Sequence, residues 1–162
     1  MRHYGQFDRH DLAELKALVP DLHGIIVGEA EPRHRPYLAE LKTAAKGKGL
    51  DNDLTFIGHR CDLREIFSVS TLVLSLSTQP EAFGRTVLEA LALGIPVAGY
   101  AQGGVGELLS AMFPAGKVVP GDRRGLAETC LSILDAPCRP AALPAQLELK
   151  HMLDDTLYAY QW

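Results

Sequence analysis

The sequence has few cysteines, no long apolar run and no excess of positive charge, and each absence narrows the possible functions. Cys61, Cys130 and Cys138 are an odd set without C-x-x-C spacing, so we expect reduced thiols in a cytoplasmic protein rather than a disulfide framework or a metal site. No segment approaches the about 18 apolar residues of a membrane span, and the N-terminus has no apolar signal core. The net charge of −4 argues against general binding to nucleic acid or anionic membranes.

The six histidines lack ligand spacing such as H-x-x-x-H, so we expect no metal. What remains is ordinary for a globular protein: 162 residues, 47% of them hydrophobic and 22% charged. We therefore predict a single domain over residues 1–162, large enough to bury a core of its own.

Short apolar runs alternate with amphipathic segments along the chain. Strands are predicted at 24–29, 54–58, 71–77, 95–100 and 116–120, and helices at 12–19, 35–50, 62–67, 84–94, 121–135 and 147–160. The proline-rich stretch 136–146 is predicted to connect to the last helix, and Asp62 is a candidate N-cap of the short helix at 62–67. The alternation predicts an α/β fold with a doubly wound, mainly parallel, Rossmann-like sheet, which binds ligands beyond the carboxyl ends of its strands.

One segment combines strand end, helix start and two glutamates: "TQPEAFGRTVLEALALGIPVAG", residues 78–99. The N–H groups of Gly84, Arg85 and Thr86 open the helix, lack intrahelical acceptors and carry the positive end of the helix dipole. Gly84 has no side chain, so an anion can approach the backbone closely. A phosphate or diphosphate is the natural ligand of such a helix start.

Glu81 and Glu89 cannot bind phosphate, but carboxylates form strong hydrogen bonds with hydroxyl pairs. Eight helical steps would separate them by about 12 Å, the length scale of a nucleotide sugar, with a diol at each end and a diphosphate between. The simpler interpretation is a solvated loop charge at Glu81 and a surface helix residue at Glu89. An NAD-binding Rossmann enzyme is disfavoured, because no G-x-G-x-x-G opens a helix after a strand.

The stretch "PEAFGRTVLEALALGIPVAGYAQGGVGEL" resembles the signature of the family 4 retaining glycosyltransferases. The shared features are E-x7-E at Glu81 and Glu89, the "LGIPVAG" strand and the "GGVGE" turn (Gly103–Glu107), and the likeness extends over nearly the whole chain. The resemblance implies the C-terminal, donor-binding half of a GT-B fold, which pairs two Rossmann-like domains.

The resemblance assigns the site residue by residue. Glu81, the predicted catalytic residue, would contact hydroxyls of the donor sugar, and Glu89 would hold the ribose. The remaining donor-binding residues would be Phe83, Gly84, Arg85 and Thr86 at the sugar and diphosphate, with Gly58, His59 and Arg60 near the base. Solvated charges remain an alternative for Arg60 and Arg85, Gly103 and Gly104 are interpreted as turn formers, and Glu107 would cap or orient that turn.

Two parts of the family pattern have no counterpart in the sequence. The first strand, with the G-R-x-x-x-x-K-G segment that neutralises the diphosphate, and the acceptor-binding N-terminal domain are both absent. We therefore expect a fragment of a longer enzyme, a rearrangement of residues 1–11, or a separate subunit that completes the site.

The predicted function is the donor-binding domain of a polysaccharide-biosynthesis hexosyltransferase. The enzyme would move a sugar from a nucleotide-diphosphate sugar to a glycan or lipid-linked acceptor with retention, without a metal or other cofactor. The isolated chain is expected to have little or no activity, and the full enzyme is expected to associate peripherally with membranes. Alternatives are a non-catalytic nucleotide-sugar-binding or partner module that needs a second Rossmann domain, and a nucleotide-sugar epimerase.

Overall fold

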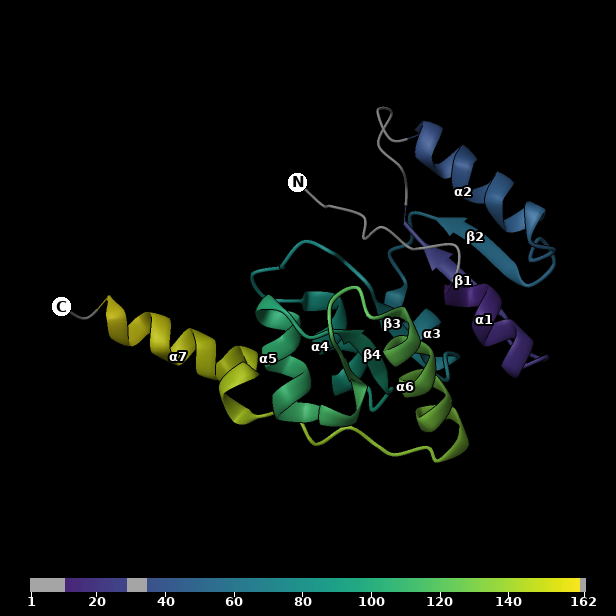
Figure 1. The fold of residues 1–162 in the computed structure, drawn as a ribbon. Helices are drawn as coiled ribbons and strands as arrows, with labels where there is room; N and C mark the ends of the chain where they lie inside the picture. Colours follow the sequence, from purple (N-terminus) through teal and green to yellow (C-terminus); the bar gives the residue numbers. More distant parts are fainter. Residues whose placement is uncertain (1–10, 29–34, 161–162) are drawn as a thin grey trace.

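The chain is described by a computed structural model that covers residues 11–28 and 35–160 (Figure 1). Its strands are β1 (Gly24–Val27), β2 (Leu54–Gly58), β3 (Val73–Ser75), β4 (Val97–Tyr100) and β5 (Lys117–Val118). Its helices are α1 (Asp11–Leu18), α2 (Arg35–Gly47), α3 (Leu63–Ser68), α4 (Arg85–Ala92), α5 (Gly103–Met112), α6 (Arg123–Asp135) and α7 (Leu149–Ala159), with short 3-10 turns η2 (Pro114–Gly116) and η3 (Ala145–Leu147). Residues 1–11, whose rearrangement was one expectation, lie outside this description apart from Asp11.

The described strands form two parallel sheets. β1 pairs with β2, and β3, β4 and β5 follow one another in a second sheet with β4 in the middle. Each strand is followed along the chain by a helix or a helical turn, and α4, α5 and α6 contact the second sheet. The α/β class, with parallel strands flanked by helices, is therefore confirmed.

The main hydrophobic core surrounds β4, all four residues of which are buried. Helices α4, α5 and α6 each contribute side chains with almost no exposed surface, such as Leu91, Leu109 and Leu126. Burial of a leucine contributes about 1.5–3 kcal/mol relative to exposure. This core packs against β3, whose carboxyl end leads into the segment that contains Glu81.

The first sheet is less well covered. Its own buried cluster consists of Ala45 and Leu50, with Leu22 and Leu54 against it, and Ile25 in β1 is 44% exposed. α1 connects the two parts, because it packs on α6 and places the buried Leu15 in the main core.

Most predicted elements lie within two or three residues of the observed ones, and the strand at 54–58 coincides with β2. The strand predicted to reach Glu29 ends at Val27, and Glu29 lies outside the described residues. The main omission is α5: the "GGVGE" segment was interpreted as a turn, but it is the start of a ten-residue helix. Gly103 and Gly104 are poor helix formers, and their presence obscured the spacing of the buried residues that follow, Val105, Leu108, Leu109 and Met112.

The last helix stands apart from the rest. α7 extends away from the molecule beyond α5 (Figure 1), and the large apolar side chains Leu153, Leu157, Tyr158 and Tyr160 are exposed. Among the described helices, none has both the length and the apolar character needed to cross a bilayer.

Candidate functional site

Gly84 forms the start of α4 on the carboxyl side of β3. It is the N-cap residue and adopts the left-handed conformation, with φ of 75°, which costs glycine little but strains other residues. Within the described residues, the N–H groups of Gly84, Arg85 and Thr86 have no hydrogen-bond acceptor. The backbone thus presents three unpaired donors and the positive end of a helix dipole at one point.

The side chains around this point lie at the surface. Phe83 is 48% exposed and Gly84 is buried, while Glu81 lies in the exposed loop before it. Arg85 reaches along α4 to Glu89, with Nη2 3.2 Å and Nε 3.3 Å from Oε1. The Glu89 side chain is 40% exposed, so it can accept further hydrogen bonds from a ligand while the ion pair persists.

The loop geometry corrects the estimated separation of the two glutamates. α4 begins at Arg85, so only the second half of the Glu81–Glu89 segment is helical. Glu81 is held instead by α5, because the N–H group of Gly104 donates to the Glu81 carbonyl oxygen at 2.9 Å. The 12 Å helical rise therefore does not describe this pair, although both residues flank the α4 start.

Gly58, His59 and Arg60 follow the carboxyl end of β2. Gly58 ends the strand with φ of 68°, and His59 and Arg60 are exposed. Arg60 Nε donates to Asp62 Oδ1 at 2.7 Å, with a second bond from Nη2 to Oδ2. These hydrogen bonds lower the pKa of Asp62. They also occupy the carboxylate, so Asp62 stands at the N-cap of α3 without capping it through its side chain, contrary to the prediction.

Sequence reasoning missed Gln102, the N-cap residue of α5. Its Nε2 atom donates to the carbonyl oxygen of Ser77 at 2.8 Å, and the Ser77 hydroxyl donates to the carbonyl oxygen of Gln79 at 2.9 Å. These bonds tie the end of β3 to the start of α5. Glutamine is not among the residues favoured at an N-cap, and Gln102 makes no side-chain cap hydrogen bond, so the local sequence carried no signal for this role.

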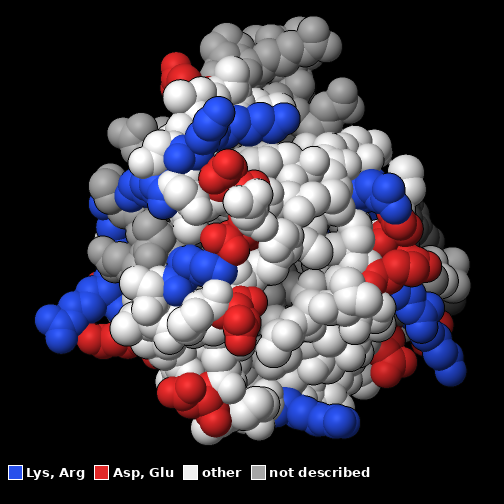
Figure 2. Space-filling view, turned by 90° about the vertical axis from the view of Figure 1, so that its right-hand side faces the viewer, with Lys and Arg blue, Asp and Glu red and all other residues white. Residues whose placement is uncertain are grey.

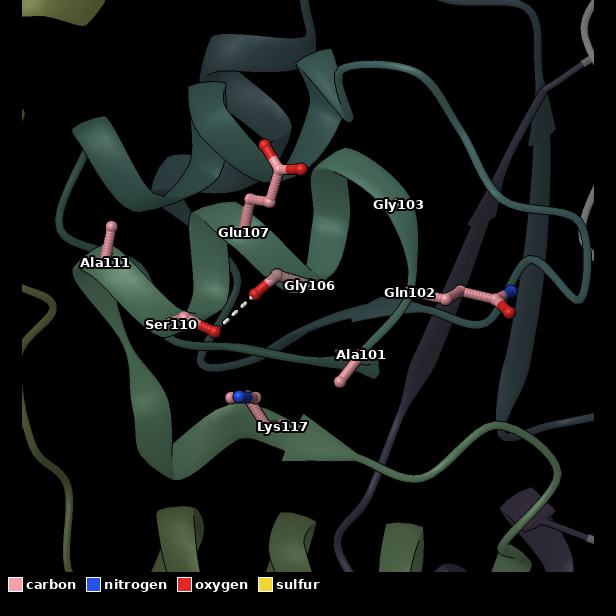
Figure 3. A pocket seen from close by; sticks show the side chains of 8 residues that line it. All are labelled: Ala101, Gln102, Gly103, Gly106, Glu107, Ser110, Ala111 and Lys117. Atoms are coloured by element: carbon pink, nitrogen blue, oxygen red, sulfur yellow. Dashed lines mark hydrogen bonds between the residues drawn. The ribbon is translucent and has the colours of Figure 1, made fainter.

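A cavity of the described residues lies away from the α4 start. It is open, measures about 610 Å³ and lies between α5 and β5, lined by Ala101, Gln102, Gly103, Gly106, Glu107, Ser110, Ala111 and Lys117. In Figure 3 the Glu107 side chain points away from Lys117, and Ser110 donates to the Gly106 carbonyl oxygen. Glu107 therefore lies inside a helix rather than capping a turn. With its polar groups pointing apart, the cavity offers no convergent set of ligands.

On the face turned to the viewer in Figure 2, acidic and basic side chains are interspersed, mainly toward the left and the right edge, with a largely uncharged area between them. Among the described residues, no three histidine, cysteine, aspartate or glutamate side chains lie close enough together to hold a metal ion. The polar groups that do converge are those at the α4 start.

Comparison with known proteins gives a consistent result. Residues 10–148 match the model of the family "Glycosyl transferases group 1". Among curated proteins, the 2-deoxystreptamine glucosyltransferase of Streptomyces kanamyceticus is 30% identical over 128 residues, which are 78% of this chain and 32% of that protein. The chain spans 26–36% of the length of the curated relatives it matches.

Solved structures extend the likeness to the fold. Anabaena HepE, crystallised in complex with UDP and glucose, has a TM-score of 0.73 and 30% identity, covering 84% of this chain and 37% of that chain. The C-terminal domain of a group 1 glycosyl transferase family protein from Francisella tularensis has a TM-score of 0.67 and 26% identity, covering 83% of this chain and 71% of that chain. The family model accounts for most of the chain, and the solved relatives share its parallel α/β architecture: this chain belongs to the group 1 glycosyl transferases.

Proposed function

We propose that this chain is the donor-binding domain of a retaining glycosyltransferase that transfers a sugar from a nucleotide-diphosphate sugar to a glycan or lipid-linked acceptor. The observation that carries the proposal is the start of α4. There the unpaired N–H groups of Gly84, Arg85 and Thr86 lie between Glu81 and Glu89, on the carboxyl side of a parallel strand. Ligands of such sheets bind at this edge.

The diphosphate would occupy the α4 start. Unpaired N–H groups and the helix dipole favour an anion there. When the sugar departs, negative charge develops on the diphosphate, and donors that are already oriented stabilise it without reorganising. The acceptor hydroxyl must also lose its proton as the new glycosidic bond forms, and we place the base for that proton with the acceptor site in the second domain rather than in this domain.

The two glutamates would bind the hydroxyl groups at the ends of the donor. Glu81, in the loop before the helix, would contact the sugar, and Glu89 would hold the ribose. Arg85 already lies against Glu89, and it orients the carboxylate for two hydroxyls. Phe83 is half exposed beside them and would cover the sugar.

The base would lie toward Gly58, His59 and Arg60. Arg60 is held by Asp62, so its guanidinium is fixed rather than free to follow the ligand. The donor alone, without a metal or cofactor, is the proposed ligand. The cationic groups that complete the diphosphate site and the acceptor site would come from a second Rossmann-like domain or subunit.

The relatives support this assignment. HepE, at 30% identity, was crystallised with UDP, with UDP and glucose, and with UDP-glucose, and the curated relative from Streptomyces is named a glucosyltransferase. UDP-glucose is therefore the first donor to test. We place the reaction in the cytoplasm, because Cys61 and Cys138 are exposed free thiols, as in a reducing compartment.

The proposal is tested by calorimetric titration of the full chain with UDP-glucose, GDP-glucose and ADP-glucose. We expect saturable binding of one donor, weakened about 10- to 100-fold by Glu89→Gln, because a hydrogen bond to a charged group contributes about 1.5–3 kcal/mol. Glu128→Gln is the matched control. Glu128 pairs with Arg124 on α6 in the same i,i+4 arrangement, at 2.8 Å, and its substitution should leave the dissociation constant unchanged.

A folded chain that binds none of the three donors would contradict the proposal. Equal weakening by Glu89→Gln and Glu128→Gln would also contradict it, because the effect would then follow from loss of any helical ion pair. Transfer of sugar by the chain alone would overturn the expectation that a second domain is required.

A further inference from the structure

The loop that carries Glu81 rests directly on the first turn of α5. The N–H group of Gly104 donates to the Glu81 carbonyl oxygen at 2.9 Å, and Gln102 Nε2 donates to the Ser77 carbonyl oxygen at 2.8 Å. Both bonds are made to backbone oxygens, so they fix the path of the chain between β3 and α4. Within the described residues, the Glu81 carboxylate itself has no hydrogen-bond or ion-pair partner.

The contact between loop and helix leaves no room for a side chain on either glycine. A methyl group on Gly103 would lie 2.5 Å from the Glu81 carbonyl oxygen, and one on Gly104 would lie 2.6 Å from the carbonyl carbon of Phe83. Separations below 3.0 Å between such atoms require the backbone to move. Two backbone segments therefore pack against each other without intervening side chains.

The same surface of α5 also supports the start of α4. A methyl group on Gly84 would lie 3.0 Å from Val105 Cγ2 and 3.3 Å from the Val105 nitrogen. Gly84, Gly103 and Gly104 thus form an interlocked contact, which we call the glycine clasp. Gly103 lies on the Glu81 side of the clasp, and Gly104 lies on the side of Phe83 and the α4 start.

We infer that Gln102, Gly103 and Gly104 are positioning residues that set the place of Glu81 relative to the anion-binding start of α4. The inference rests on the proposed function, because it concerns recognition of the donor. A misplacement of about 1 Å can cost an enzyme about 100-fold in rate, and an exposed loop residue without side-chain partners depends on its backbone for placement. The glycine clasp fixes the position of Glu81 through α5, a helix that lies outside the E-x7-E segment.

The two glycines have different expected effects. Gly103→Ala displaces Glu81, so it should impair contact with the sugar while the nucleotide remains bound through α4. Gly104→Ala displaces Phe83 and the α4 start, so it should weaken binding of sugar and diphosphate together. A general loss of stability would weaken UDP and UDP-glucose alike and would leave the ratio of their dissociation constants unchanged.

The experiment uses the full chain with Gly103→Ala, Gly104→Ala and two controls, Gly47→Ala and Gly121→Ala, glycines with no atom in reach of an added methyl group. Gly121, with φ of 81°, controls for the strain that alanine meets at Gly103, where φ is 53°. We measure dissociation constants for UDP and UDP-glucose and, without ligand, hydrogen exchange of the residue 104 amide, which donates to the Glu81 carbonyl oxygen. Exchange should accelerate about tenfold or more in both clasp variants and not in either control. The preference for UDP-glucose over UDP should fall toward one in Gly103→Ala.

Unchanged exchange of the residue 104 amide in folded clasp variants would overturn the inference, as would an unchanged preference in Gly103→Ala. If the wild-type chain binds neither ligand, the proposed function fails, and hydrogen exchange alone then decides the positioning inference. If neither glycine variant folds, Gln102→Ala decides it. This change removes the bond to Ser77 without adding bulk, and exchange equal to wild type would overturn the inference.

Discussion

The two sheets of this molecule contain the same kind of parallel strand but differ in how completely their side chains are covered. In the three-stranded sheet, β4 is buried along its whole length and lies within a core to which α4, α5 and α6 contribute side chains. In the two-stranded sheet, the strands are only half buried and the associated buried cluster is Ala45 and Leu50. The difference predicts that the two parts contribute unequally to stability.

The proposed donor site includes residues from both the well-covered and the less covered part. The groups for the diphosphate and sugar, around Glu81 and Gly84, rest on the well-packed sheet and on α5. The groups for the base, Gly58 to Arg60, follow β2 in the less covered sheet. Precise contacts require supporting residues that are locked by packing, so the structure favours strict recognition of the diphosphate and sugar and looser recognition of the base.

The largest predicted effect comes from truncating one leucine in each part. Leu109→Ala removes a side chain with no exposed surface from the main core and should lower the free energy of unfolding by about 2–5 kcal/mol. Leu50→Ala empties a site in the small cluster, where the surroundings can collapse and water can enter, so its cost should lie at or below the lower end of that range. Urea denaturation followed by circular dichroism measures both.

Equal losses for the two variants would contradict the comparison, since they would mean that the small cluster is packed as tightly as the main core. The m-value provides the control. A Leu50→Ala variant with a lower m-value would indicate separate unfolding of the two-stranded part rather than a loss of packing in a two-state protein.

The smallest predicted effect concerns the Arg60–Asp62 pair of the base side. The hydrogen bonds from Arg60 lower the pKa of Asp62, so ionised Asp62 stabilises the folded state at neutral pH. This contribution disappears as the pH falls through the folded-state pKa, because the carboxyl group is then protonated. The melting temperature of Asp62→Asn should thus be slightly below that of the wild type at pH 7 and equal to it in acid. A difference in melting temperature that grows as the pH is lowered would contradict the assignment. Asp51→Asn, at an exposed aspartate before β2, is the control.

Much of the fold could be predicted from local patterns. The β2 run "LTFIG" and the helix start at Gly84 follow from apolar runs and a glycine at a boundary. The expected sites also lie where the fold class places them, on the carboxyl side of β2 and β3. These features depend on residues close together in sequence, which propensity and periodicity describe well.

The features that were missed depend on which side chains pair and on tertiary contacts. The side chain of Asp62 was expected to cap α3, but Arg60, two residues upstream, takes the carboxylate. Gly103 and Gly104 were interpreted as a turn, although their lack of side chains serves the contact with Glu81 and Phe83. A glycine needed for close backbone approach and a glycine needed for a turn look the same in a single sequence.

The central claim is that the donor binds at the start of α4, and amide NMR of the labelled chain titrated with UDP-glucose tests it most directly. The account predicts saturable shifts that are largest at Gly84, Arg85 and Thr86, with smaller ones at Gly58 to Arg60. Shifts centred instead on the open cavity around Ser110 and Lys117, or no shifts from a folded chain, would contradict it.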